Sequence, residues 1–185
     1  VDVNNTKTEN LVNPLGLDTT VPRFSWQITS DQNDVVQTAY EILVASSIDK
    51  LNTGDGDLWN SGKIKSSEQL WIAYNGKQLK SNQRGYWKVR AYTNKGLTEW
   101  SKPQEFGIGL LKESHWSGRW IGLERLMEGE QKGLHTRLAA RYLRKEFELK
   151  DMQVVRATAH VSGLGLYELF INGKSQGRRT KDLSV

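Results

Sequence analysis

The 185-residue sequence predicts an all-β chain that begins with an antiparallel β-sandwich. Three observations predict this class. Apolar and polar residues alternate in several short segments, turn-forming residues separate those segments, and no clear helical period occurs before residue 110. An alternation of period two places one set of side chains on a core face and the other set towards water. Short strands that are separated by turns favour a two-layer sandwich.

The clearest alternation lies in residues 23–28, 40–45 and 87–92, and each of these segments is predicted to be a strand. Their expected core-facing side chains are Phe24, Trp26, Ile28, Tyr40, Ile42, Val44, Trp87, Val89 and Ala91. Turn-forming residues fill the intervals at 52–56, 61–62, 75–76 and 94–96, where Asn-Gly and Gly-rich pairs favour tight reversals.

Residues 85–106 are typical of the closing strands of such a domain. Trp87 supplies a buried aromatic, residues 94–96 supply a turn, and Trp100, Ser101 and Phe106 follow it. This order resembles the end of a fibronectin type III domain. The resemblance predicts a fibronectin type III or immunoglobulin-like sandwich for residues 1–109. Trp87 stands where that family usually has tyrosine, which puts the tyrosine-corner hydrogen bond in question.

A second domain is predicted after residue 109. Residues 155–161 and 167–171 alternate, and Asn172-Gly173 after them is a strong hairpin signal. Residues 134–149 fit both a helix and a strand, so their structure stays open. We expect residues 110–185 to form the beginning of a second, jelly-roll-like β-sandwich domain that is incomplete within this chain.

Composition excludes several functional classes. The chain has no cysteine, which rules out disulfides and thiolate metal sites, and His115, His135 and His160 lie too far apart for a local zinc motif. Residues 1–109 carry no net charge, so the excess of +5 belongs to residues 110–185, where acidic residues interrupt the basic ones. Neither a metal, a cofactor nor nucleic acid is therefore predicted as a ligand. No apolar run reaches the roughly 18 residues of a membrane span.

Seven segments then occur in an informative order. They are residues 13–26 (NPLGLDTTVPRFSW), 39–47 (AYEILVASS), 57–64 (DLWNSGKI), 86–96 (YWKVRAYTNKG), 116–122 (WSGRWIG), 142–149 (YLRKEFEL) and 161–174 (VSGLGLYELFINGK). Together they resemble the N-terminal accessory region of bacterial α-L-rhamnosidases of glycoside hydrolase family 78, from Leu11 to about Gly177. The first and last segments are fairly specific, although the last one alone also resembles jelly-roll accessory domains of other glycosidases.

The resemblance implies that the bond-breaking residues lie elsewhere in the polypeptide. In that family, a downstream (α/α)₆ domain hydrolyses terminal α-L-rhamnosides with inversion, using two carboxyl groups about 6.5–9.5 Å apart. The acidic residues of this chain, Asp55 and Asp57 in a Gly-rich turn and Glu124, Glu128 and Glu130 in a polar loop, do not suggest a positioned pair. We therefore predict no catalytic residues here, and an inactive chain whose partner is the downstream catalytic domain.

Two further functional hypotheses stay open. A carbohydrate-binding module would use flat, exposed aromatic rings, for which the candidates are Trp59, Trp71, Tyr74 and Tyr92; packing inside the protein is the competing interpretation of these rings. A protein-interaction module is the other hypothesis, because Trp100-Ser101 resembles part of the Trp-Ser motif of cytokine receptors.

Two predictions concern the surroundings of the chain. Exposed sheet edges of an incomplete sandwich could allow self-association. The resemblance to exported glycosidases favours a periplasmic or extracellular location.

Overall fold

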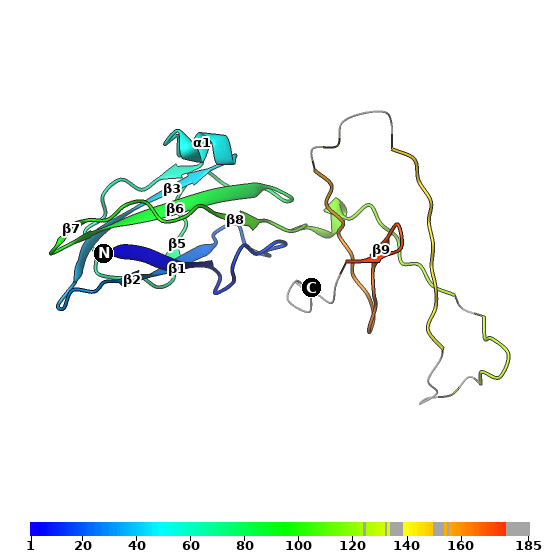
Figure 1. Cartoon of the computed structure of the whole chain (residues 1–185). Coiled ribbons are helices and arrows are strands. Elements are labelled where there is room, and N and C mark those ends of the chain that lie inside the picture. Colours follow the sequence, from blue (N-terminus) through cyan, green and yellow to red (C-terminus); the bar gives the residue numbers. More distant parts are fainter. Residues whose placement is uncertain (124, 132, 134–138, 150–153, 155, 177–185) are drawn as a thin grey trace. The chain divides into compact units, whose positions relative to one another are not determined.

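The computed structural model describes residues 1–123, 125–131, 133, 139–149, 154 and 156–176. The chain divides into two units, one made of Val1–Trp116 and Gly165–Val185 and the other of Ser117–Leu164. Nearly all regular structure lies in the first 107 residues, where two antiparallel sheets form a sandwich (Figure 1).

The first sheet has the strand order β1-β2-β5. It consists of β1 (Asp2–Thr8), β2 (Arg23–Thr29) and β5 (Ile72–Ala73). Both pairings are antiparallel, and a register shift between Asn4 and Lys7 interrupts the first one. Strand β2 is therefore the centre of this layer and carries its largest buried side chains, Phe24 and Trp26.

The second sheet is built around β3 (Gln37–Ala45) and β6 (Arg84–Thr93), which pair antiparallel along most of their length. Strand β4 (Trp59–Asn60) pairs with β3, whereas β7 (Gly96–Leu97) and β8 (Gln104–Gly107) both pair with β6. The strands that alternation predicted at residues 23–28, 40–45 and 87–92 thus correspond to β2, β3 and β6. The all-β sandwich is confirmed.

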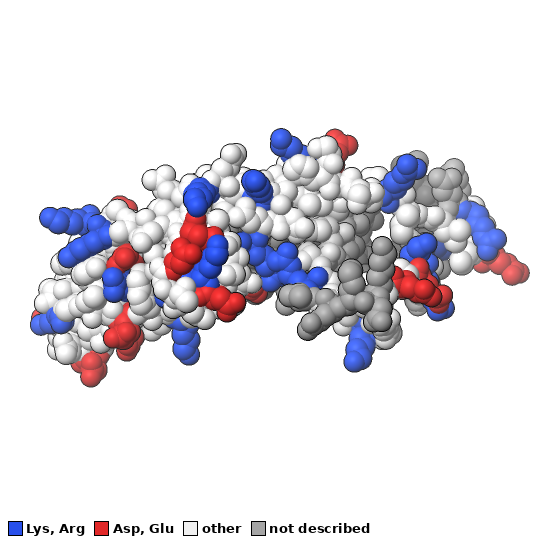
Figure 2. Space-filling view, turned by 90° about the horizontal axis from the view of Figure 1, so that it is seen from above, with Lys and Arg blue, Asp and Glu red and all other residues white. Residues whose placement is uncertain are grey.

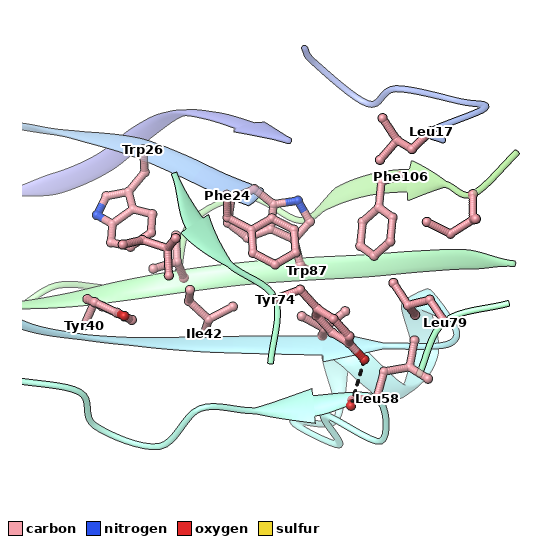
Figure 3. Packing of buried hydrophobic residues seen from close by; sticks show 14 residues of the cluster. Leu17, Phe24, Trp26, Tyr40, Ile42, Leu58, Tyr74, Leu79, Trp87 and Phe106 are labelled. Carbon is pink, nitrogen blue, oxygen red and sulfur yellow. Dashed lines mark hydrogen bonds between the residues drawn. The ribbon is translucent and has the colours of Figure 1, made fainter. Parts of the chain in front are cut away.

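Large aromatic side chains fill the space between the two sheets (Figure 3). Phe24 and Trp87 face one another from opposite layers with ring centroids 4.4 Å apart, and Phe106 lies 5.9 Å from Phe24. Trp26, Trp87 and Phe24 are each at most 1% exposed. The predicted core positions of Trp26 and Trp87 are confirmed, and Tyr86 packs on the opposite face of the second sheet beside Leu43.

The one α-helix of the sandwich was not predicted. Helix α1 (Ile48–Asn52) spans five residues between β3 and β4, with the side chain of Ser47 accepting a hydrogen bond from the amide of Lys50 as an N-cap. A helix this short shows no measurable apolar period. It lies over the outer face of the second sheet, where Leu51 is fully buried.

The chain that leaves the sandwich stays attached to it. The amide of Gly109 donates to the carbonyl of Leu17, and the amide of Asn82 donates to the carbonyl of Gly109. A short 3₁₀-helix, η1 (Glu113–His115), follows. Hydrogen bonds to the sandwich continue beyond residue 109, at Leu111 and His115. The division between domains after residue 109 stays a prediction.

The described residues between 117 and 169 form neither helix nor strand. Alternation at residues 155–161 predicted a strand there, but the described members of that segment are not in one. Part of the segment that fits both a helix and a strand lies outside the described residues, namely residues 134–138. Val155 lies outside them too.

The predicted hairpin at Asn172-Gly173 is confirmed. Strands β9 (Phe170–Ile171) and β10 (Lys174–Ser175) pair antiparallel. Both turn residues have left-handed backbones, with φ of 50° for Asn172 and 75° for Gly173, as a two-residue turn of type I′ requires. The jelly-roll-like second sandwich stays a prediction, of which the structure describes this one hairpin.

Candidate functional site

Two of the four candidate aromatic rings belong to the core. Trp59 on β4 lies 6.4 Å from Phe24 and 5.5 Å from Tyr74, measured between ring centroids. Tyr74 is only 4% exposed, and its hydroxyl donates to the carbonyls of Leu58 and Lys77 (Figure 3). Burial raises the pKa of Tyr74 to about 12. The Tyr74 ring therefore offers no face to a ligand, and Trp59 is largely engaged in packing.

The third candidate ring, Tyr92, lies on the outer face of the second sheet. The ammonium of Lys63 stands 4.0 Å from its ring centroid. Further along the same face, Trp100 lies 4.6 Å from the guanidinium of Arg90 and 5.1 Å from the ammonium of Lys88. Cations at these distances are attracted by the π-faces of aromatic rings. The outer face of the second sheet thus carries a row of contacts in which each aromatic ring has at least one cation beside it.

Two hydroxyl groups fix the segment that carries Trp100. Thr98 accepts a hydrogen bond from the amide of Ala91, and Ser101 accepts one from the amide of Val89. Both hydroxyl groups therefore accept hydrogen bonds from backbone amides of β6 in the interval between its pairings with β7 and with β8. This arrangement places Trp100 beside the cations of β6, and the Trp-Ser resemblance stays a prediction.

The fourth candidate ring, Trp71, is presented at the edge of the first sheet. It is 44% exposed and precedes β5, with its amide donating to the side chain of Ser25 at 3.1 Å. The guanidinium of Arg23 lies 4.2 Å from the centroid of the indole. Arg23 in turn pairs with Glu9, with a closest N–O distance of 2.6 Å.

The four candidate residues do not gather into one site. Trp59 and Tyr74 meet in the core, Tyr92 lies on the outer face of the second sheet, and Trp71 belongs to the first sheet. Their role in carbohydrate contact stays a prediction. The arrangement of the sandwich favours Trp71, because its ring is the exposed one that also has a polar pair beside it.

Sequence reasoning missed the charged partners of these rings. Arg23 and Glu9 are 14 residues apart, and Arg90 and Glu41 are 49 apart. Alternation does predict that Arg23 and Arg90 point away from the core, since each neighbours a core position. Nothing in the sequence signals which carboxylate each arginine meets, because strand pairing decides that.

Among the described residues, the acidic side chains singled out from the sequence show no arrangement suited to acid–base catalysis. Burial alone would raise the pKa of Asp57, but hydrogen bonds from Lys50 and Ser46 outweigh it and lower the pKa to about 2. Hydrogen bonds from Arg141 likewise lower the pKa of Glu130 to about 2. A general acid needs a pKa near the working pH. Glu124 lies outside the described residues, and the described part of the chain holds no cluster of three potential metal ligands.

The depressed pKa of Asp57 predicts an acid-dependent loss of stability. A group whose pKa falls from 3.8 to about 2 on folding stabilises the fold fully above pH 3.8. That contribution disappears as the pH falls through 2. Replacing Asp57 by Asn should lower the free energy of unfolding at pH 7, and the difference from wild type should shrink between pH 4 and pH 2. Urea unfolding at several pH values measures this, with the exposed Asp31→Asn as the matched control.

A constant difference between wild type and Asp57→Asn across that pH range would contradict the assignment. It would mean that Asp57 acts through packing rather than through its charge.

One serine–histidine pair resembles a nucleophile and its base. The hydroxyl of Ser81 lies 2.6 Å from Nδ1 of His115 and also accepts from the amide of Leu111 at 3.1 Å. Both members are on the surface, in a turn and in η1. The pair fastens the segment after β8 to the sandwich, and no carboxylate is hydrogen-bonded to His115 in the described structure, as a catalytic triad would require.

Charges of both signs are mixed on the visible face of the molecule (Figure 2). Basic and acidic side chains are interspersed on the face seen in Figure 2, instead of forming a patch of one sign. Among the described residues, no helix has the length and apolarity needed to cross a bilayer.

Comparison with known proteins supplies the family context. The family described as "Rha78A-like, N-terminal immunoglobulin domain" matches residues 3–112. An α-L-rhamnosidase of Formosa agariphila is 37% identical over an alignment of 185 positions, which covers 92% of this chain and 19% of that protein. The chain therefore spans about a fifth of the length of this relative.

Two solved structures are similar to the described fold. The α-L-rhamnosidase from Dictyoglumus thermophilum is 37% identical, with a TM-score of 0.63, over 66% of this chain and 14% of that one. The α-L-rhamnosidase of Streptomyces avermitilis, complexed with L-rhamnose, is 38% identical, with a TM-score of 0.61, over 65% and 12% of the two chains.

Proposed function

The chain belongs to the Rha78A-like family through its N-terminal immunoglobulin domain, and from this membership we propose that it is a non-catalytic accessory part of an α-L-rhamnosidase. The observation that carries the proposal is the coverage. The match extends over 92% of this chain but only 19% of the relative. Most of each similar protein thus lies outside the part that corresponds to these residues. We place hydrolysis in that remaining, unmatched part.

The partner of the chain in this proposal is the downstream catalytic domain of the same polypeptide. The sandwich contributes a rigid body, because Phe24, Trp26 and Trp87 of its core are at most 1% exposed and its outgoing chain is hydrogen-bonded to it. Terminal α-L-rhamnosides would be hydrolysed with inversion in the downstream domain. The ion-paired states of Asp57 and Glu130 support a non-catalytic role.

An assay of the isolated chain tests the proposal. The 185-residue polypeptide, incubated with p-nitrophenyl α-L-rhamnopyranoside, should release p-nitrophenol no faster than buffer does, since a pair of positioned carboxyl groups is missing from its described residues. The control is the same assay with an active α-L-rhamnosidase added. Turnover that scales with chain concentration, survives repurification and falls in an Asp57→Asn or Glu130→Gln variant would overturn the accessory role.

Three narrower parts of the proposal rest on the family alone. A periplasmic or extracellular location follows from the need of such enzymes to reach glycans outside the cytoplasm. Self-association through sheet edges would follow if the segment after residue 117 pairs with a second copy. Contact with rhamnose-containing glycans is the third part. The sandwich offers a specific candidate for it in Trp71, and protein interaction through the face around Trp100 is the less favoured use of this domain.

A further inference from the structure

Trp71 is unusual among the tryptophans of the sandwich. Of the five between residues 26 and 100, Trp26 and Trp87 are buried, Trp59 and Trp100 are half-buried, and Trp71 is exposed. Its backbone also has a left-handed conformation, with φ of 59°. A bulky side chain rarely adopts such a backbone, and a position of this kind persists only where the surrounding structure enforces it.

The surrounding structure does enforce it, through strand β2. The amide of Trp71 donates to the hydroxyl of Ser25, and the carbonyl of Gln69 accepts from the amide of Trp26. The chain on both sides of Leu70 is therefore tied to the same strand. The indole is exposed and the backbone that carries it is tied to β2, which favours a preformed contact surface.

A second strained residue meets the same arginine. In the part of the chain that the structure describes, eight residues other than glycine have positive φ, and six of them are Asn or Asp, which tolerate this region. The two others are Trp71 and Glu9, with φ of 50° for Glu9. Both contact Arg23: its guanidinium lies over Trp71, and its Nε, Nη2 and backbone amide donate to the carboxylate of Glu9. The two strained residues that are neither Asn nor Asp, Trp71 and Glu9, therefore lie around the same arginine, and the three residues form one cluster.

This cluster has the chemistry that a pyranose ring requires. The C–H face of a sugar packs on an aromatic ring, while its hydroxyl groups need nearby donors and acceptors. Arg23 and Glu9 supply both kinds of group, and their charges cancel, which favours a neutral sugar over an anionic one. The cation–aromatic row around Trp100 differs, because two cations, Lys88 and Arg90, lie over its ring and only Arg90 is paired with a carboxylate, that of Glu41.

We propose that Trp71, Arg23 and Glu9 form a contact site for a neutral pyranose, and in particular for a terminal deoxyhexose such as L-rhamnose. The apolar methyl group of a 6-deoxy sugar enlarges the surface that an indole can cover. The choice of sugar rests on the proposed function of the chain. The site itself rests on the geometry of the three residues.

Titration of the ¹⁵N-labelled chain with L-rhamnose tests the site. Seven indole N–H signals are expected from the seven tryptophans, and the Trp71 signal is identified as the one missing from the Trp71→Ala spectrum. L-rhamnose at millimolar concentration should shift that signal, and D-glucose should shift it less. Trp71→Ala should weaken binding at least about tenfold, as truncation of a central aromatic contact does. Trp120→Ala, which removes an exposed indole from the other unit, should leave binding unchanged.

The variant Arg23→Lys distinguishes a sugar-binding site from an exposed tryptophan that has only a packing role. It keeps the positive charge but loses the planar guanidinium. Binding should therefore weaken by several fold, while the spectrum remains that of a folded protein. Absence of any shift at tens of millimolar sugar, or unchanged binding in folded Trp71→Ala, would overturn the site. The assay on the aryl rhamnoside is independent, so an inactive chain that binds no sugar would remove this inference and leave the accessory role intact.

Discussion

Replacing Trp87 by alanine should lower the free energy of unfolding of the sandwich by about 3–5 kcal/mol, the range for truncating a fully buried aromatic side chain. Trp87 is 0% exposed and lies 4.4 Å from Phe24 of the opposite sheet. Its Nε1 also donates to the hydroxyl of Thr8 at 3.0 Å, and Thr8 is buried. The substitution therefore leaves a cavity between the layers and removes a buried hydrogen bond, which adds to the cost.

Urea unfolding followed by far-ultraviolet circular dichroism measures the loss. Trp87→Phe should fall between wild type and Trp87→Ala, because it keeps a ring against Phe24 but loses the bond to Thr8. Trp120→Ala, at a residue 70% exposed, should leave the transition of the sandwich in place. Equal stability of wild type and Trp87→Ala would refute the packing of the two sheets around this ring.

The sandwich could be predicted because its strands obey a local rule. Phe24 and Trp26 on β2, and Trp87 and Val89 on β6, are two positions apart, and this spacing alone assigns them to a core face. The hairpin at Asn172-Gly173 was likewise predictable, since only a few residue pairs, among them Asn-Gly, readily adopt the left-handed backbone that a two-residue turn needs. Each of these features depends on neighbours in the sequence.

Features that depend on distant neighbours escaped prediction. Thr8 receives the Nε1–H of Trp87 across 79 positions, in place of the tyrosine-corner bond that the resemblance put in question. The left-handed backbone of Trp71 was equally invisible, because strand β2 imposes it through Ser25. The alternation at residues 155–161 shows the reverse case, because the local pattern is clear and yet the described residues of that segment are not in a strand.

The same distinction explains the candidate rings. Composition and spacing identify Trp59, Trp71, Tyr74 and Tyr92 as aromatic residues in strands or turns, but exposure is a property of the assembled layers. Tyr74 resembles a surface residue next to the turn at residues 75–76, yet its hydroxyl reaches the carbonyl of Leu58 on another segment (Figure 3). A turn residue can thus be buried when two loops meet, and the meeting point of these two loops is closely packed.

Gly76 lies at that meeting point, and Gly76→Ala should destabilise the sandwich by about 1–3 kcal/mol, the range for forced overpacking. A Cβ there would stand 2.4 Å from the carbonyl oxygen of Leu58 and 2.6 Å from the hydroxyl of Tyr74. The carbonyl belongs to the backbone, so it cannot rotate away as a side chain could. It also accepts from the hydroxyl of Tyr74 and from the amide of Lys77. A displacement would weaken both bonds, at about 1 kcal/mol for each bond lost.

Gly122→Ala is the matched control, because a Cβ at Gly122 has no neighbour within 4 Å, and it should leave the unfolding transition unchanged. Tyr74→Phe in the Gly76→Ala background adds a second test. It removes the hydroxyl that the new methyl group meets but not the carbonyl of Leu58. The double variant should therefore recover only part of the lost stability. Full recovery would show that the side chain of Tyr74, and not the backbone of the opposing loop, sets the requirement for glycine.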